Sequence, residues 1–318
     1  MKIVVIGTYF GSFPDSMSLW LKSCSYNPGV DFLVFTDQTI AKLPKNVKTI
    51  KMNLREFSDL ATKKLDIEEI NITRTYKCCD FKPVYGIIFA DYIMKYDYWG
   101  HCDFDLIFGD ILSNIEDDVW DKYDKILPLG HLSFYKNTKE VNDRYKCESA
   151  TANYKEVFTS DKSYAFDEFN GMMNIYERNN FPFYKKRVFA DIDSIYKRFR
   201  LSLNDKNYKN QVFYWEDGRA IKAYVDSGKI KTSEYAYIHF KKRKNLPIKI
   251  ADIEACHSFF VTRYGFIEKK KKGIPTLSEI KKLNPYRGFW FERTEYYRFR
   301  FNNMMRKIRC SIKKKGEK

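Results

Sequence analysis

The sequence lacks the features that would place the chain in a membrane or send it for secretion. Its 318 residues contain no apolar run of about 18 or more, so no membrane-spanning helix is expected. The apolar stretch at residues 3–6 is too short for a signal peptide, and no small-residue cleavage site follows it. We therefore expect a cytoplasmic protein whose first apolar stretch is a buried strand.

The sequence also lacks a cysteine framework and a dinucleotide fingerprint. Seven cysteines form an odd set without a Cys-x-x-Cys pair, which argues against zinc binding and paired disulfides and favours reduced, buried thiols. The loop after the first strand reads Gly-x-x-x-Gly over residues 7–11, not Gly-x-Gly-x-x-Gly.

Acidic residues are scarce only at the carboxyl end. The formal net charge is +16, yet residues 1–238 are balanced and the whole excess lies in 239–318. The body is therefore not a general polyanion binder, and the carboxyl-terminal part is expected to meet negative charge.

The last segment of the chain has the pattern of an amphipathic helix. Its apolar residues recur at helical spacing, with basic residues on the other face. We favour an interfacial helix on an anionic membrane, at the inner face of the cell membrane, and expect no nucleic-acid partner. An aromatic-basic nucleic-acid strip and a helix packed on the body are the alternatives. The apolar positions are Tyr297, Phe301, Met304, Met305, Ile308 and Ile312.

The amino-terminal part predicts an α/β fold. A strand at 2–7, a helix at 16–24 and strands at 31–37 and 47–52 are typical of doubly wound sheets, which bind ligands beyond the carboxyl ends of their strands. The residues at those ends suit a nucleoside, because Tyr9 can stack on a base and Asp37 can accept from ribose or a base N–H. Ordinary loop chemistry explains them equally well. These residues are Thr8, Tyr9 and Asp37.

An Asp-x-Asp sequence follows a second apolar run. In an extended chain Asp103 and Asp105 point to the same face, roughly 6–7 Å apart. Paired carboxylates in a core repel each other unless a cation lies between them, and hard oxygen ligands suit Mg²⁺ or Mn²⁺ with substrate phosphates. We therefore expect a metal–phosphate site here. The alternative is a solvated strand end.

A basic cluster precedes the helix expected over 84–94. Arg74, Lys77 and Lys82 before a helix start suit an anion, and Asp80 could orient one of these bases or contact a sugar hydroxyl. The alternative is a solvated loop.

Two later stretches carry further candidates. Asp167 and Glu168 lie among aromatic residues, where a carboxylate can have a raised pKa and act as a general base, bind sugar hydroxyls, or merely cap a helix. His239 ends an apolar strand and precedes Lys241 and Lys242. It could be a third metal ligand, with the lysines neutralising phosphate oxygens, or a structural histidine.

Together these residues resemble a GT-A glycosyltransferase. The blocks Tyr76–Pro83, Trp99–Asp110, Gly130–His131 to Asn137 and Phe166–Glu168 resemble, more specifically, an uncharacterised bacterial family encoded in capsule and O-antigen polysaccharide clusters. The resemblance covers roughly 1–245.

The resemblance implies a GT-A fold, Rossmann-like, with a mixed, mostly parallel sheet flanked by helices. It implies a hexosyltransferase-like enzyme that moves sugar from a nucleotide-sugar, most often a UDP-sugar, to a glycan or lipid-linked glycan. It also implies that Asp103 and Asp105 bridge ribose and Mn²⁺ or Mg²⁺, with His239 as a further metal ligand or a diphosphate contact. Thr8, Tyr9 and Asp37 would surround the nucleoside. It places His131 among the nucleotide-sugar-binding residues, and Asp167 or Glu168 as base or as hydroxyl ligands.

We expect a catalytic domain over 1–250 and a helical, basic-aromatic extension over 251–318. A metal-dependent nucleotide-diphosphate hydrolase or nucleotidyltransferase could use the same aspartates. Non-enzymatic polyanion binding through the tail, and lectin-like binding of free glycan, also stay open.

Overall fold

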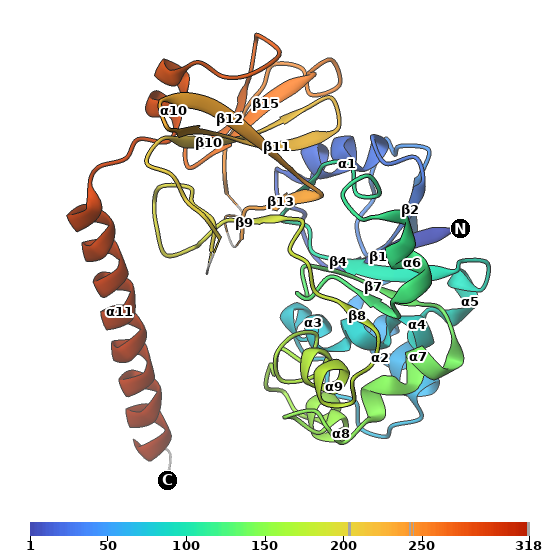
Figure 1. The fold of residues 1–318 in the computed structure, drawn as a ribbon. Helices are drawn as coiled ribbons and strands as arrows, with labels where there is room; N and C mark the ends of the chain where they lie inside the picture. The colour runs from blue at the N-terminus through green and yellow to red at the C-terminus, as the bar shows by residue number, and fades with distance from the viewer. Residues whose placement is uncertain (203–204, 242, 244, 317–318) are drawn as a thin grey trace.

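A mixed seven-stranded sheet forms the centre of the protein in the computed structural model, which describes residues 1–202, 205–241, 243 and 245–316 (Figure 1). The first four strands in its spatial order run parallel, and β7 then pairs antiparallel with β4. In spatial order the strands are β3 (Val47–Lys51), β2 (Val30–Thr36), β1 (Ile3–Tyr9), β4 (Tyr98–Cys102), β7 (Leu132–Lys136), β6 (Lys125–Ile126) and β8 (Phe183–Tyr184).

Alternating side chains of the central strands feed two cores, one on each face of the sheet. Val4 and Ile6 of β1 belong to one buried cluster, whereas Ile3 and Val5 belong to the other. This two-residue period is the one expected for a strand that is covered on both faces. The predicted α/β class, with a mostly parallel sheet between helices, is therefore confirmed.

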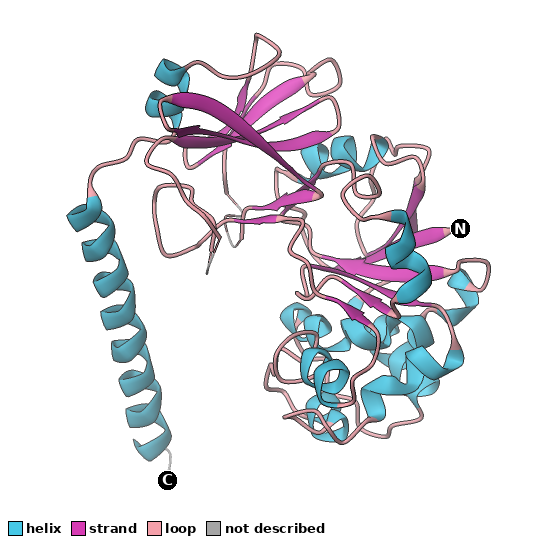
Figure 2. Cartoon of the chain, viewed as in Figure 1, coloured by secondary structure: helices cyan, strands magenta, loops and turns pink. Residues whose placement is uncertain are grey.

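The helices are mostly short, and Figure 2 shows most of them gathered on one side of the sheet. The helix expected over 84–94 is divided at Phe89 into α4 and α5. The helices of the body are α1 (Met17–Ser25), α2 (Leu54–Leu65), α3 (Cys78–Phe81), α4 (Tyr85–Ile88), α5 (Ala90–Ile93), α6 (Asp117–Lys122), α7 (Lys139–Asp143), α8 (Tyr154–Thr159), α9 (Met172–Arg178) and α10 (Leu277–Leu283). Single 3₁₀ turns lie at Thr75–Lys77, Lys82–Val84 and Arg144–Lys146.

A small three-stranded sheet connects the central sheet to a second, six-stranded one. It consists of β5 (Leu106–Phe108), β13 (Tyr237–His239) and β9 (Ala190–Asp191). The six-stranded sheet is ordered β12 (Lys229–Tyr235), β11 (Arg219–Asp226), β10 (Gln211–Glu216), β15 (Ser258–Thr262), β16 (Gly265–Glu268) and β14 (Ile248–Lys249).

The six-stranded sheet corrects the expectation that residues 251–318 are helical. Residues 258–262 pair antiparallel with β10, and residues 265–268 pair with them in turn. Aromatic and β-branched residues are good strand formers, and the burial of Phe259 and Val261 in the first segment and of Phe266 in the second completes a core of this sheet. Helical structure begins only at α10.

The last helix, α11 (Phe289–Gly316), projects along one side of the body (Figure 1). Glu292 in its first turn pairs with Arg198 at 2.6 Å and Arg200 at 2.7 Å, which holds the start of the helix to the body. Among the described residues, no helix combines the length and the apolar character that crossing a membrane requires.

Candidate active site

The Asp-x-Asp sequence lies at the carboxyl end of β4, as predicted. All five residues of β4 are buried, and β5 begins directly after Asp105. The backbone N–H of Asp103 donates to the carbonyl of His131 at 2.9 Å, and the carbonyl of Asp105 accepts from the N–H of Phe240 at 3.1 Å. These bonds fix both aspartates where the central sheet meets the three-stranded one.

The three residues predicted to bind metal are brought together. Single ligand atoms of Asp103, Asp105 and His239 lie within 4.8 Å of one another. His239 reaches the aspartates because β13 pairs antiparallel with β5, which places it opposite Leu106. Two carboxylate oxygens and an imidazole nitrogen at this spacing fit a divalent cation such as Mn²⁺ or Mg²⁺ after a small contraction.

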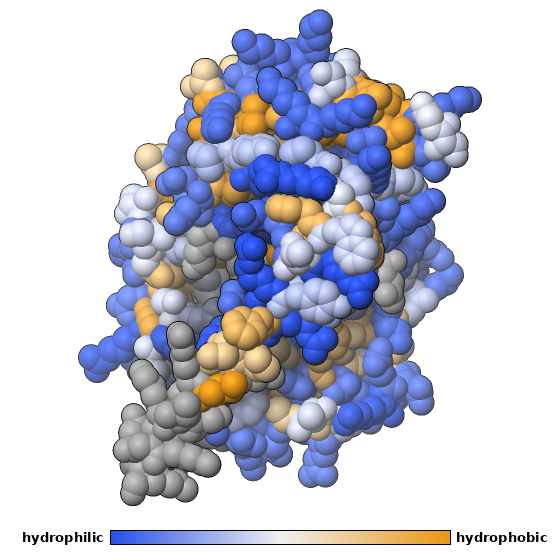
Figure 3. All heavy atoms as spheres, turned by 90° about the vertical axis from the view of Figure 1, so that its left-hand side faces the viewer, coloured by the Kyte–Doolittle hydropathy of each residue, from blue (hydrophilic) through white to orange (hydrophobic). Residues whose placement is uncertain are grey.

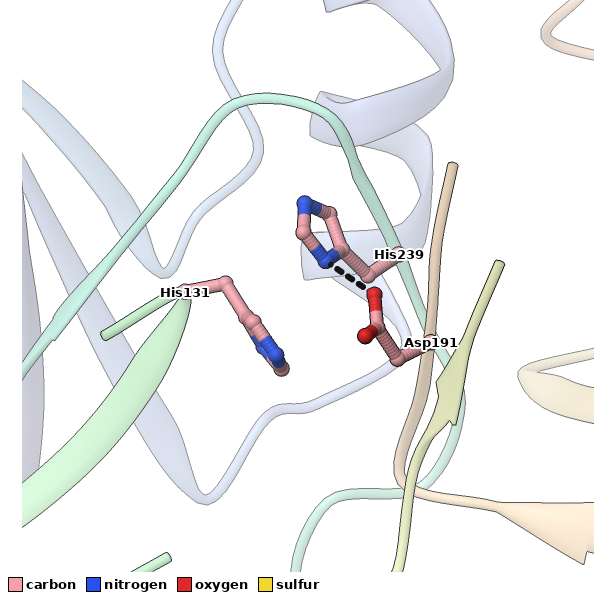
Figure 4. Close-up of side chains that lie close together, drawn as sticks. All are labelled: His131, Asp191 and His239. Carbon is pink, nitrogen blue, oxygen red and sulfur yellow. Dashed lines mark hydrogen bonds and ion pairs between the residues drawn. The ribbon is translucent and has the colours of Figure 1, made fainter. Parts of the chain in front are cut away.

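His239 is oriented by an aspartate that the sequence analysis missed. Asp191 is 2% exposed, and its Oδ1 lies 2.8 Å from Nδ1 of His239 (Figure 4). This bond leaves Nε2 of His239 facing Asp105 at 3.4 Å. A carboxylate on the far ring nitrogen is a common way to orient a metal-binding histidine. Asp191 itself accepts from Ser202 Oγ at 2.5 Å.

The electrostatics of this pair are consistent with that role. Burial alone would lower the pKa of His239, but the hydrogen bonds to Asp105 and Asp191 raise it to about 9. Burial would likewise raise the pKa of Asp191, yet its bond to His239 holds it below its usual value. The chain therefore keeps negative charge around the imidazole, and a cation that binds Nε2 at neutral pH displaces a proton.

His131 lies beside this cluster and shares two of its neighbours, Asp191 and His239. Its ring centroid is 4.3 Å from that of His239, and His131, Asp191 and His239 also bring ligand atoms within 4.8 Å (Figure 4). Nδ1 of His131 lies 2.8 Å from the hydroxyl of Tyr237, which has no other hydrogen-bond partner among the described residues. Burial holds the pKa of His131 well below its usual value, so the ring is neutral. Its Nε2 is buried and has no hydrogen-bond partner among the described residues.

Lys82 is the predicted basic residue that reaches the site. Its Nζ lies 2.5 Å from Asp103 Oδ1, 2.9 Å from the carbonyl of Gly130 and 3.5 Å from Asp167 Oδ2. Burial opposes its charge, but the carboxylates of Asp103 and Asp167 raise the pKa of Lys82 well above its usual value. An ammonium group therefore links Asp103 of the candidate metal group to the second acidic pair.

The second acidic pair, Asp167 and Glu168, lies against the turn at Gly130. Burial raises the pKa of Asp167 to about 7, against the opposing effect of Lys82. Glu168 Oε1 accepts from the N–H of Gly130 at 3.0 Å. A β-carbon at residue 130 would lie 2.0 Å from Asp167 Oδ2, so this close approach requires glycine.

The expected cluster of Arg74, Lys77 and Lys82 does not form one anion site. Lys77 is fully buried, and its Nζ donates to Asp80 at 2.9 Å and to two carbonyls, which uses all three of its N–H groups. Arg74 donates to the carbonyl of Asp161 at 2.8 Å. Both bases therefore brace the segment that leads to Asp167.

Asp80 takes part in the same bracing. Its carboxylate accepts from the backbone N–H groups of Tyr164 at 3.1 Å and Phe166 at 3.2 Å. Of the two roles expected of Asp80, the structure shows the first, because its carboxylate orients the base Lys77 from a position behind the acidic pair.

The candidates for nucleoside binding lie at the carboxyl ends of β1 and β2. Thr8 Oγ1 is 2.8 Å from the hydroxyl of Tyr85, and Asp37 accepts from the N–H of Gly11 at 2.9 Å. The ring of Tyr9 stacks on Phe13 with centroids 4.8 Å apart. Burial and the nearby Asp105 raise the pKa of Tyr9.

Lys241 lies at the edge of the site, with Nζ 3.6 Å from Asp191 Oδ2. Its φ of 33° falls in a region that non-glycine residues rarely occupy, and such strained positions cluster at functional sites. Lys242 lies outside the described residues.

Comparisons with known proteins give similar solved structures and one family. The structures include the galactosyltransferase LgtC in complex with donor and acceptor sugar analogs (12% identity, 59% of this chain, 75% of that chain, TM-score 0.33). Mouse xyloside xylosyltransferase 1 in its apo form is similar over 78% of this chain and 100% of that one (8% identity, TM-score 0.42). The glycosyltransferase GlyE of Streptococcus pneumoniae TIGR4 is similar over 51% and 44% (13% identity, TM-score 0.29).

No curated protein matches the chain. A family model described as "Family of unknown function (DUF6625)" matches residues 5–270. This match spans every residue of the site described above, from Thr8 to Lys241, and ends before α11.

Proposed function

The chain belongs to the family of unknown function DUF6625, and we propose that it is a metal-dependent glycosyltransferase that uses a nucleotide-sugar donor. The convergence of Asp103, Asp105 and His239 at the end of a parallel strand carries this proposal. The sequence resemblance to GT-A glycosyltransferases, most of which use UDP-sugars, supports the same conclusion. The acceptor is a glycan or a lipid-linked glycan of bacterial surface polysaccharide synthesis.

The residues of the site form two groups, one that acts on the leaving nucleoside diphosphate and one that acts on the acceptor. A bound divalent cation supplies positive charge to the nucleoside diphosphate as the glycosidic bond breaks. Asp103, Asp105 and His239 would hold it, and Lys241, whose Nζ lies 3.6 Å from Asp191 Oδ2, would neutralise a phosphate oxygen. On the acceptor side, Asp167 is buried and has a raised pKa, which suits a base for an acceptor hydroxyl.

The experiment is a thermal-shift titration of the full chain with UDP, GDP, CMP and ADP, each with Mn²⁺ or EDTA. A ligand that binds only the folded protein raises the melting temperature. We expect one nucleotide, UDP, to raise it with Mn²⁺ and to lose that effect with EDTA. A shift that is insensitive to EDTA would contradict the metal site, and release of UDP from a UDP-sugar without transfer to any glycan would favour a hydrolase.

The carboxyl-terminal helix supplies the membrane contact of this proposal. One stripe of α11 exposes its apolar side chains, each at least 43% exposed: Trp290, Tyr297, Phe301, Met304 and Ile308. Figure 3, in which the side of the molecule that carries α11 in Figure 1 faces the viewer, shows hydrophobic and hydrophilic residues interleaved on the visible surface. The strongly basic sequence of the helix complements an anionic bilayer, which would place the enzyme at the inner face of the cell membrane.

Vesicle flotation of the full chain tests this contact. We expect binding to vesicles of phosphatidylcholine with phosphatidylglycerol, little binding to phosphatidylcholine alone, and release at high salt, because surface charge is screened. Replacing Trp290, Phe301 and Met304 with Ser should abolish binding. The matched control replaces Met94 and Tyr264, which are exposed on the body, with Ser. Equal flotation of the helix variant and the control would refute the contact.

A further inference from the structure

Lys82 is shared between the two halves of the site. Its side chain is 5% exposed, and its three N–H groups face three acceptors. Asp103 Oδ1 at 2.5 Å belongs to the metal ligands, Asp167 Oδ2 at 3.5 Å belongs to the acidic pair, and the third acceptor is the carbonyl of Gly130 at 2.9 Å. One buried ammonium therefore balances two carboxylates.

Two cations therefore compete for the carboxylate of Asp103, the ammonium of Lys82 and a bound metal ion. Asp103 pairs with Lys82, and it contributes a ligand atom to the group formed with Asp105 and His239. Two positive charges on one carboxylate repel each other, and burial weakens the screening that water would provide. Asp167 offers Lys82 a second partner within ion-pair distance, so the ammonium needs only a small movement to change carboxylates.

We propose that Lys82 is the built-in counter-cation of Asp103, and that binding of a divalent cation at Asp103 transfers the ion pair of Lys82 to Asp167. The proposal rests on the metal site of the proposed function. It makes cation binding and the Lys82–Asp167 pair thermodynamically coupled, so each favours the other by the same factor. Asp167, on the acceptor side, is then fully paired with Lys82 only when a divalent cation is bound at Asp103.

The coupling predicts opposite effects of two substitutions on one binding constant. Lys82→Met removes the competitor and should lower the Kd for Mn²⁺ by roughly tenfold. Asp167→Asn removes the alternative partner, keeps Lys82 on Asp103 and should raise the Kd severalfold. In the Lys82→Met background, Asp167→Asn should have little further effect, because the residue through which it acts is gone.

The measurement is the Kd for Mn²⁺ alone, obtained from the electron paramagnetic resonance signal of free Mn²⁺ with the full chain and its variants. Lys122→Met is the matched control, because Lys122 pairs with Asp118 on the exposed face of α6. Lys82→Arg keeps the charge and should retain the wild-type Kd. Lys82→Gln is a second neutral variant should the methionine variant fail to fold, and it should also bind Mn²⁺ more tightly.

Each outcome separates this inference from the proposed function. Equal Kd values for the wild type and the neutral Lys82 variants would overturn the inference and leave the metal site standing. An equal rise in the Kd for Mn²⁺ on Asp167→Asn, with and without Lys82, would also overturn the inference. The carboxylate of Asp167 would then act on the cation directly through its charge. Absence of Mn²⁺ binding in all variants would remove both proposals.

Discussion

Replacing Asp105 with Asn is expected to lower the rate of sugar transfer by on the order of 10³-fold. The substitution removes one of the two carboxylates of the metal group and the negative charge that faces Nε2 of His239 at 3.4 Å. An amide oxygen is a weaker ligand for a divalent cation and carries no charge. The nucleoside diphosphate would then leave with its negative charge poorly stabilised.

Initial rates of UDP release and of glycan product, measured across a Mn²⁺ titration, check this expectation. Asp118→Asn makes the same chemical change on the exposed face of α6 and should leave the rate unchanged. High Mn²⁺ should restore only part of the Asp105→Asn rate, because the missing ligand also positions the cation. Rates within threefold of the wild type at saturating Mn²⁺ would show that Asp105 is not a ligand.

The convergence of Asp103, Asp105 and His239 was predictable because each part of it has a local signal. The two aspartates follow an apolar run at two-residue spacing, and His239 ends another apolar strand. Asp191 could not be placed in this way. Its contact with His239 depends on the parallel pairing of β9 with β13 across 48 residues, and a two-residue strand shows no period.

The basic cluster shows the reverse error, in which nearby residues were grouped although they face different ways. Residues 75–84 form a continuous helical stretch, so Lys77 and Lys82 lie about 140° apart around its axis. Lys77 therefore points into the core toward Asp80, while Lys82 points to Asp103. The strands at 258–268 did carry a signal in their aromatic and β-branched residues on both sides of the turn at Arg263 and Tyr264, but the charge of the tail obscured it.

Replacing Asp167 with Asn is expected to lower transfer by roughly 10²- to 10⁴-fold, the usual contribution of a general base. Asn preserves the shape of the side chain but cannot take a proton from an acceptor hydroxyl. The pKa of Asp167 is raised to about 7 without a bound cation, and closer pairing with Lys82 lowers it, so the wild-type rate should rise with pH as the carboxylate ionises, with its inflection below about 7. The variant should show no such inflection. An unchanged inflection would assign it to another group and leave Asp167 with a positioning role only.

The same carboxyl group should make the free energy of unfolding fall as the pH rises, whereas the transfer rate rises. Burial raises the pKa of folded Asp167 from 3.8 to about 7, so the folded protein holds this proton over a range where the unfolded chain has released it. Stability from this group is therefore complete below about pH 4 and is lost as pH rises toward 7, by roughly a few kcal/mol. The Asp167→Asn variant does not lose this stability as the pH rises.

Urea denaturation of the variant and the wild type from pH 5 to 8 measures the effect. The difference between their free energies of unfolding should grow with pH in favour of the variant. A constant difference would mean that Asp167 is ionised in the folded protein throughout this range, and that Lys82 outweighs its burial.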